Sequence, residues 1–214
     1  MPVDPNEYLK KGYRMDNGNV VTPEFRASYV FLFQPRSNKK PGKTPKYCCN
    51  MVFPVGTDLT VLKKAAYDVV VKQFGVDQSV WPKFKSPFKS QDDRVGKDKG
   101  YEPGGEYLIP NSNNRPGIVD AAVKPILNAS DVYGGCYGVA MVRAYWYDND
   151  QKGVGFELVN FQKTRDGEPL GNRSLPESGF QPVGSGGDSA PMPGNPFGAP
   201  ASAAPTGHLG DIFK

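Results

Sequence analysis

The chain has 214 residues, 38% of them apolar, which is enough to bury one core of ordinary size in a single domain. No run approaches the ~18 apolar residues of a membrane-spanning helix, and the N-terminus lacks the basic and apolar segments of a signal peptide, so we expect a cytoplasmic protein. The formal net charge is +4. Because the side chains from Ser174 onward sum to −2, residues 1–173 carry +6, which suits a polyanionic partner.

The first predicted elements form a hairpin. Residues 1–23 are polar and rich in turn formers, and we expect a loosely held N-terminal arm. Glu24 to Gln34 then alternates large apolar residues with others, which predicts a strand. A basic loop with three prolines, Pro35 to Pro45, leads to a second predicted strand over Lys46 to Phe53. The pair would have a long, charged tip.

One helix is predicted after this hairpin. Apolar residues recur at helical spacing from Leu59 to Phe74, with Asp58 as a capping residue before them and Gly75 to end the helix. Its apolar stripe is expected to pack on the sheet. Trp81 to Gly105 shows no sustained period and is interpreted as an ordered excursion loop. A short strand is expected over Gly105 to Pro110.

The most informative stretch runs from Tyr133 to Gln162 and predicts a long hairpin. Its first strand alternates strictly, and this period of two puts flat side chains and one guanidinium on one face. These residues are Tyr137, Val139, Met141, Arg143, Tyr145 and Tyr147. A turn at Asp148 to Gly153 leads to the second strand, through Val154 to Asn160.

Five or six strands, one helix between early strands, and several glycine kinks favour a small closed barrel. The predicted fold is mainly β: a single oligonucleotide/oligosaccharide-binding (OB) barrel with one helix packed on it and a disordered C-terminal tail. The domains would be an arm over 1–23, the barrel over 24–173 and a flexible tail over 174–214. The tail ends in an apolar and acidic tip that contains Asp211, Ile212 and Phe213.

The usual catalytic constellations are missing from the sequence. The one histidine, His208, lies in the tail, which argues against Ser–His and Cys–His pairs and histidine metal sites. No Walker loop or Gly-x-Gly-x-x-Gly motif follows a predicted strand. Asp pairs such as Asp92 with Asp93 fall in charged turns, where Asp serves turn geometry. We therefore expect no catalytic residue, metal or cofactor, and the three cysteines are expected to be small buried residues.

Aromatic rings beside cations on one sheet face are typical of proteins that hold unpaired bases by stacking and phosphates by charge. The loop from Arg36 to Lys43 would grip the nucleic-acid backbone. The core rather than the ligand is expected to take Phe25, Phe31, Phe33, Phe53 and Phe156. The candidate binding residues are Arg36, Lys39, Lys40, Lys43, Lys46, Tyr47, Trp81, Arg115, Arg143, Tyr145, Tyr147 and Lys152.

Short motifs spread over residues 20–173 connect the chain to a known group. They are Phe25 to Pro35, Lys46-Tyr47, the helix from Leu59, Asn114-Arg115-Pro116, Tyr137-Gly138, Lys152-Gly153-Val154 and Gly167 to Gly171. In these motifs the chain resembles phage single-stranded DNA-binding proteins with an OB barrel and a mobile C-terminal tail.

This resemblance implies sequence-nonspecific binding of single-stranded DNA during phage DNA replication, recombination and repair, in the cytoplasm of an infected bacterial host. It also implies that the tail contacts a polymerase, helicase or nuclease. Such proteins carry a strongly acidic tail that ends in an aromatic residue. Here acids are few and Lys214 follows Phe213, so docking of Ile212 and Phe213 into an apolar pocket is favoured over competition with DNA.

Other functions stay open from the sequence. A virion or assembly β-barrel protein without a DNA-processing role would form large oligomers, whereas a DNA-binding protein of the first kind is expected to be a monomer or dimer. A strand-annealing factor would speed the pairing of complementary strands, and a nuclease would need magnesium.

Overall fold

The structure is a computed structural model that describes residues 5–37, 42, 44–149 and 151–171. The elements are, in chain order, α1 (Pro5–Lys11), β1 (Tyr13–Arg14), β2 (Val20–Val21), β3 (Phe25–Arg36), β4 (Lys46–Phe53), α2 (Thr60–Phe74), a 3₁₀ turn η1 (Gln78–Val80), β5 (Lys89–Ser90), β6 (Glu106–Leu108), β7 (Asn111–Ser112), β8 (Gly117–Val119), a 3₁₀ turn η2 (Ala129–Asp131), β9 (Tyr137–Asp148) and β10 (Lys152–Arg165).

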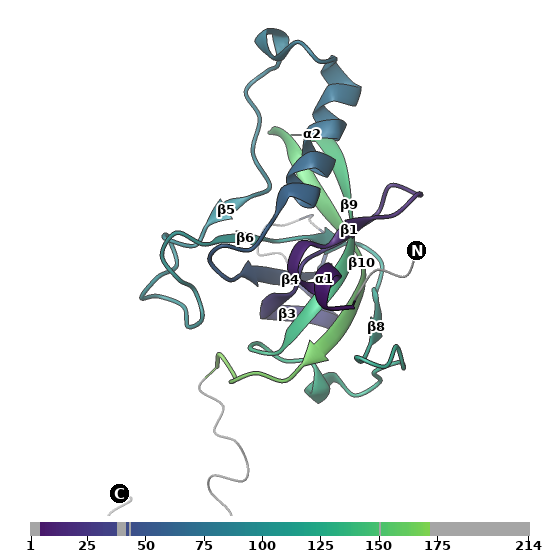
Figure 1. Ribbon diagram of the computed structural model, residues 1–214, viewed down its shortest axis with the longest axis vertical. Coiled ribbons are helices and arrows are strands. Elements are labelled where there is room, and N and C mark those ends of the chain that lie inside the picture. Colours follow the sequence, from purple (N-terminus) through teal and green to yellow (C-terminus); the bar gives the residue numbers. More distant parts are fainter. Residues whose placement is uncertain (1–4, 38–41, 43, 150, 172–214) are drawn as a thin grey trace, which may run out of the picture. The chain divides into compact units, whose positions relative to one another are not determined.

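Five strands form a closed circuit. β3 pairs with β4, β4 with β7, β7 with β10, β10 with β9, and β9 again with β3. The β7–β10 pair is parallel and the other four pairs are antiparallel. A small five-stranded barrel closed in this way is an OB barrel, and the predicted fold class is confirmed. Figure 1 shows β3 and β4 beside the long β9–β10 hairpin.

The barrel interior takes alternate residues of each strand. On β10, Phe156 and Leu158 are buried, and on β9 Ala140 and Val142 fill the same core. The predicted core positions Phe25, Phe53 and Phe156 are confirmed as buried. The core is therefore built from the period-two pattern of the strands.

Phe31 and Phe33 were also predicted to lie in the core. Both are half-buried, but only Phe33 packs against the core, whereas Phe31 lies on the outer face. The cause is Tyr29, whose φ of 48° is rare for a residue other than glycine. The β3–β4 register shifts between Ser28 and Phe31. Past this β-bulge Leu32 is buried, and Phe31, its neighbour along the strand, takes the other face.

Helix α2 forms where predicted and packs on the core through Leu62, Ala65, Ala66 and Val70. At its start the Thr60 amide donates to Asp58 Oδ1 at 2.9 Å, and hydrogen bonding from Thr60 lowers the pKa of that carboxyl. At its end Gly75 has a φ of 81°, and its amide donates to the Val71 carbonyl at 2.7 Å. Figure 1 shows α2 alongside the outer end of the β9–β10 hairpin.

The N-terminal region differs from the loosely held arm expected over residues 1–23. β2 pairs with β9, and Val20 is fully buried. The Thr22 hydroxyl accepts a hydrogen bond from the Ala140 amide at 3.0 Å. A two-residue strand is too short to show a period, so this pairing could not be predicted from the residue pattern.

The cysteines and acidic residues of the described part of the chain can be compared with what the sequence predicts. Cys48, Cys49 and Cys136 are buried and free of disulfides, as predicted. Over the part of the chain that the structure describes, three or more His, Cys, Asp or Glu side chains nowhere gather as a metal site would require. No helix in that part has the length and apolar character needed to cross a membrane.

Candidate nucleic-acid interface

Strand register places one row of side chains around the outside of the barrel. Phe31 is paired with Cys48, Cys48 with Asn111, Asn111 with Glu157, and Glu157 with Arg143. Paired residues project to the same face of a sheet. The row faces outward, because its neighbours along the strands, among them Cys49, Leu158 and Val142, belong to the core.

Tyr145 and Tyr147 continue this outward face along β9. Their ring centroids are 6.3 Å apart, with planes inclined by 53°. Each ring has a glycine across the ladder, because Gly155 is paired with Tyr145 and Gly153 with Tyr147. Both rings are half-buried, and burial above all raises the pKa of Tyr145, with a smaller contribution from the Glu157 carboxylate.

A groove of about 400 Å³ opens beside these tyrosines. Its volume lies in the range of ligand-binding clefts. Its lining combines two tyrosine rings, three lysines and an apolar base. The lining residues are Lys46, Lys85, Ser86, Pro87, Lys89, Leu108, Ile109, Pro110, Asn111, Tyr145, Tyr147, Asn149, Val154, Gly155 and Phe156.

The wall opposite the tyrosines is the segment from Lys85 to Lys89. Backbone hydrogen bonds attach it to β10, since the Lys85 amide donates to the Lys152 carbonyl at 2.9 Å and the Val154 amide donates to the Lys85 carbonyl at 3.1 Å. Lys85 thereby forms a parallel bridge with Gly153. The wall is part of the predicted excursion loop and brings two cations to the groove.

The side chain of Gln91 holds this loop in place through buried hydrogen bonds. Its side chain is only 1% exposed. Nε2 donates to the carbonyls of Phe53 at 2.7 Å and Glu106 at 2.9 Å, and Oε1 accepts from the Glu102 amide at 2.8 Å. One amide side chain thus satisfies three backbone groups, in line with the rule that buried polar groups find partners.

Among the predicted binding residues, Lys46, Tyr145 and Tyr147 line the groove. The Lys46 ammonium Nζ donates to Asn111 Oδ1 at 3.2 Å, across from β4 to β7. The placement of Tyr145 and Lys46 on one channel is the arrangement that the stacking hypothesis requires.

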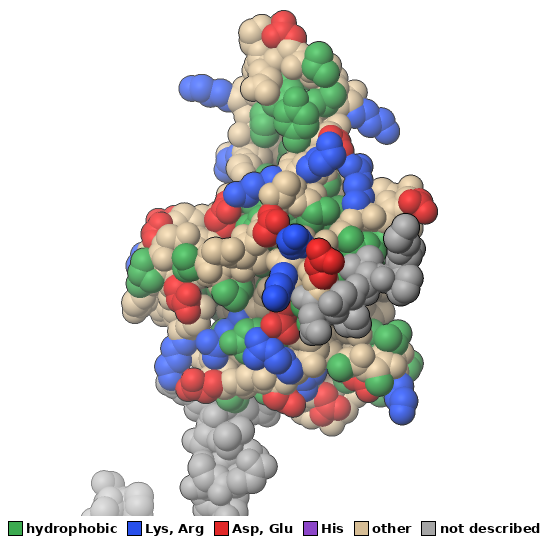
Figure 2. Space-filling view, in the orientation of Figure 1, with side chains coloured by type: hydrophobic (Ala, Val, Ile, Leu, Met, Phe, Trp, Pro, Cys, Tyr) green, Lys and Arg blue, Asp and Glu red, His purple; other side chains and the backbone are tan. Residues whose placement is uncertain are grey.

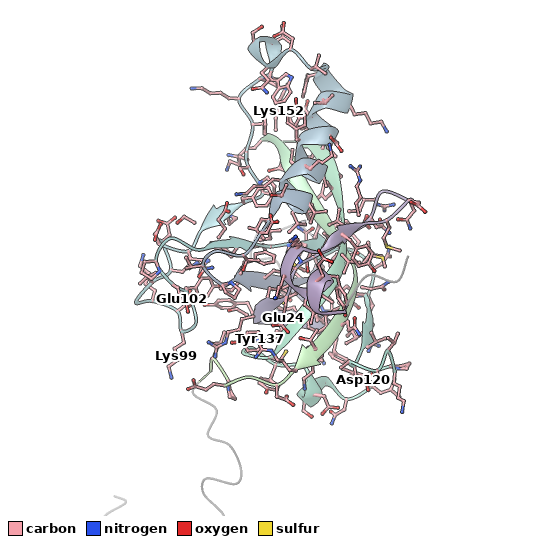
Figure 3. The ribbon with its side chains drawn as sticks, viewed as in Figure 1. Glu24, Lys99, Glu102, Asp120, Tyr137 and Lys152 are labelled. Carbon is pink, nitrogen blue, oxygen red and sulfur yellow. The ribbon has the colours of Figure 1, made fainter. Side chains whose placement is uncertain are left out.

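Arg143 shares the outward face with the tyrosines but has a carboxylate beside it. Its Nη2 donates to Glu157 Oε2 at 2.5 Å and its Nε to the same oxygen at 3.1 Å. Lys152 lies at the hairpin tip, where its Nζ is 3.4 Å from Asp148 Oδ2, and Figure 3 labels it at the outer end of the hairpin. Both charges are therefore partly balanced by neighbouring acids.

Two predicted arginines cover phenyl rings. The Arg36 guanidinium carbon Cζ lies 5.5 Å from the ring centroid of Phe31, and that of Arg115 lies 5.2 Å from the ring of Phe33. Arg36 is also the register partner of Lys46 at the end of the β3–β4 hairpin.

The structure does not bring Tyr47 and Trp81 to the groove. Alternation places Tyr47 on the face of β4 opposite Lys46. Trp81 packs against Tyr67 of α2, and its Nε1 donates to the Gly75 carbonyl at 3.0 Å. The other predicted residues, Lys39, Lys40, Lys43, Asp211, Ile212 and Phe213, lie outside the described residues.

Lys85, Lys89 and Asn111 line the groove but were not among the predicted binding residues. The signal that could have found the two lysines is a basic cluster from Lys83 to Lys99, whose charge is offset in the sequence by Asp92, Asp93 and Asp98. Asp92 and Asp98 have local partners. Asp92 accepts from the Ser90 hydroxyl at 2.5 Å and the Gly104 amide at 2.8 Å.

Tyr137, at the opposite end of β9 from the groove tyrosines, is occupied by other contacts. The Arg165 Cζ lies 3.4 Å from its ring centroid and the Arg26 Cζ 5.9 Å from it. Arg165 also forms an ion pair with Glu24 at 2.8 Å. Figure 3 shows Tyr137 beside Glu24 and far along the hairpin from Lys152.

The five-stranded barrel places the protein in the class of OB domains, and its outer surface carries an aromatic and basic groove. The chain belongs to the family described as Enterobacter phage Enc34, ssDNA-binding protein, whose model matches residues 18–190. It is also 32% identical over 151 residues to putative protein p50 of Acyrthosiphon pisum secondary endosymbiont phage 1, covering 67% of this chain and 81% of that protein.

Solved structures of the same fold are similar to this one. The single-stranded DNA-binding protein from bacteriophage Enc34, in complex with ssDNA, superposes with a TM-score of 0.63 at 22% identity, over 76% of this chain and 94% of that chain. Gp2.5, a single-stranded DNA-binding protein encoded by bacteriophage T7, gives 0.50 at 13% identity, over 75% and 99%. These likenesses support the barrel fold.

Proposed function

We propose that this protein binds single-stranded DNA without sequence preference, in the groove between the tyrosines of β9 and the wall from Lys85 to Lys89. The single observation that carries the proposal is that Tyr145 and Tyr147 line one channel with Lys46, Lys85 and Lys89. Membership of the Enc34 ssDNA-binding family supports the choice of ligand.

The binding would work by two additive effects. Bases would stack on the tyrosine rings, each stacked base contributing roughly 1–3 kcal/mol whatever its identity. Lysine ammonium groups would neutralise phosphates and release counterions, which makes affinity fall as salt is added. Such a protein acts by occupying the strand, so the proposed activity is binding and not catalysis.

The biological setting is part of the same proposal. Coating of exposed template in the cytoplasm of an infected bacterium would serve phage DNA replication, recombination and repair. The sequence of the tail tip, with Asp211, Ile212 and Phe213, supports contacts with replication proteins. A monomer or dimer is proposed, and gel filtration of nuclease-treated protein would reveal a large oligomer if the chain served virion assembly instead.

Fluorescence anisotropy with labelled oligo-dT at a series of salt concentrations tests the binding. The logarithm of affinity should fall linearly with the logarithm of salt, and Lys46→Gln should flatten the slope by about 0.7 if it removes one phosphate contact. Tyr145→Ala should weaken binding at every salt concentration. Tyr67→Ala is the matched control, because Tyr67 is an exposed tyrosine on α2 that does not line the groove. Salt-independent binding, or equal losses in both tyrosine variants, would contradict the proposal.

A further inference from the structure

The Phe31 ring occupies an unusual position on the barrel surface. It is half-buried on the outward face of β3, where it is the register partner of Cys48. Among the described residues, Val30 and Phe33 pack against the main core whereas Phe31 does not. The Arg36 guanidinium covers it instead, with Cζ 5.5 Å from the ring centroid. The core therefore gives no reason for an aromatic residue here.

The β-bulge at Tyr29 is what turns this ring outward. Without the register shift between Ser28 and Phe31, odd-numbered residues would continue to face inward as Phe25 and Ala27 do. A non-glycine residue at positive φ costs free energy that the surrounding structure must offset. The β-bulge at Tyr29 thus places Phe31 on the same face of the barrel as the groove.

In the strand register Phe31 lies two strands away from the groove. Cys48 lies between Phe31 and Asn111 in the register, and Asn111 lines the groove. Neighbouring strands are about 4.8 Å apart, so two strand spacings amount to roughly 10 Å. Lys46 lies beside these residues, since its Nζ contacts Asn111 and its register partner is Arg36.

We propose that Phe31 and Arg36 form a second base-stacking position, which receives a nucleobase of a strand that also passes over Tyr145 and Tyr147. This inference rests on the proposed function and extends it across the barrel from β9 to β3. The phenyl ring offers a π face to a base, and the planar guanidinium can stack on the same base or pair with the adjoining phosphate. The base of one nucleotide would stack on Phe31, and its phosphate would pair with Arg36.

The experiment compares oligo-dT of increasing length, from four to about sixteen nucleotides, with wild-type protein, Phe31→Leu and Tyr145→Ala. Leu keeps an apolar side chain at position 31 and removes the π face. Tyr67→Leu serves as the matched control at an exposed aromatic residue of α2. Thermal unfolding of each variant establishes that the barrel is intact.

Wild-type affinity should rise with length until the strand reaches both positions. Phe31→Leu should match the wild type on the shortest oligonucleotides that bind, and should lose about fivefold or more on long ones, the loss expected for one stacked base. A Phe31→Leu variant that binds every length like the wild type, while Tyr145→Ala is impaired, would overturn the second position and leave the groove standing. If Tyr145→Ala also binds every length normally, the proposed function itself fails.

Discussion

Tyr145 on β9 lies directly across the ladder from Gly155 on β10, and a Cβ built at Gly155 would come within 2.8 Å of the Tyr145 ring carbon Cζ. The ring therefore rests over bare backbone, with no neighbouring side chain on that side. Because the far end of a tyrosine side chain can move, an added methyl group would displace the ring rather than the strand. Gly155 thus sets the position of a proposed stacking surface.

Gly155→Ala should weaken binding of oligo-dT by several-fold, because the Tyr145 ring is pushed from its place over β10, while the melting temperature changes little. Anisotropy titration and thermal unfolding measure the two effects. Gly134→Ala is the matched control, since a Cβ there would meet only Leu170 Cβ, at 4.0 Å. Unchanged affinity in Gly155→Ala, with Tyr145→Ala impaired, would show that the ring position over the glycine is unimportant.

Gln91 should matter for stability more than its place in a loop suggests. Gln91→Leu leaves the carbonyls of Phe53 and Glu106 and the amide of Glu102 without their partner. An unsatisfied buried polar group costs about 1–3 kcal/mol, so the free energy of unfolding should fall by at least that amount. Urea unfolding measures it.

The control for this variant is Gln73→Leu, at an exposed glutamine of α2, where a change within about 0.5 kcal/mol is expected. Because Gln91 holds the loop that carries Lys85 and Lys89, DNA affinity should also decrease at temperatures where the variant is still folded. A Gln91→Leu protein as stable as the wild type would show that the loop is held by other contacts.

The pH dependence of stability should report on Asp98. The Tyr29 hydroxyl donates to Asp98 Oδ1 at 2.5 Å and Arg94 Nη1 donates to Oδ2 at 2.8 Å, and these hydrogen bonds lower the pKa of the carboxyl. A group whose pKa is lower in the folded state stabilises above its unfolded pKa of about 3.9, and this stabilisation is lost as the pH falls through the folded pKa.

Asp98→Asn should therefore melt at a lower temperature than the wild type at pH 7, and the gap should narrow as the pH falls below about 4, near the ordinary pKa of Asp. Melting curves over this pH range measure the gap. Asp93→Asn, an exposed position of the same loop, should follow the wild type throughout. A gap that is constant with pH would rule out the carboxylate charge as its source.

The long hairpin shows what the sequence could predict. Strict alternation along β9 is a local property, so the placement of Arg143, Tyr145 and Tyr147 on one face could be predicted from spacing alone. The pairing of Tyr145 with Gly155 could not, because register depends on the turn between the strands. The helix and the β4 strand were predicted for the same local reason.

Other features of the fold and of the groove could not be predicted, because they depend on contacts between segments that are distant in the sequence. The β-bulge at Tyr29 turns Phe31 from the inner to the outer face of β3. The residue types around Tyr29 do not predict its positive φ. Lys85 and Lys89 reach the groove only because their segment pairs with the edge of β10 and because Gln91 is buried beneath it. A cluster of basic residues in the sequence does not show toward which surface their side chains point. These lysines were therefore not predicted as binding residues.

Glu157 is the acid on the proposed DNA path, and its removal gives the sharpest test of that path. It is the register neighbour of both Asn111 and Arg143, and it accepts two hydrogen bonds from the Arg143 guanidinium. Its carboxylate would repel a phosphate and reduce the charge that Arg143 offers. Glu157→Gln should thus tighten oligo-dT binding several-fold at low salt and steepen the salt dependence by up to about 0.7, the value for one added phosphate contact.

Stability should hardly change in this variant, because an exposed ion pair contributes about 0–1 kcal/mol. Arg143→Gln should have the opposite effect on binding, since it leaves the Glu157 carboxylate uncompensated on the path. The matched control is Glu24→Gln, which breaks an ion pair with Arg165 at the far end of the hairpin and should leave affinity unchanged. Glu157→Gln and Glu24→Gln each remove one negative charge, so an effect of net charge alone would be the same in both variants. Figure 2 shows acidic and basic side chains interspersed over the face in view. If Glu157→Gln weakens binding, or if Glu24→Gln tightens it equally, DNA does not follow the row from β9 to β7.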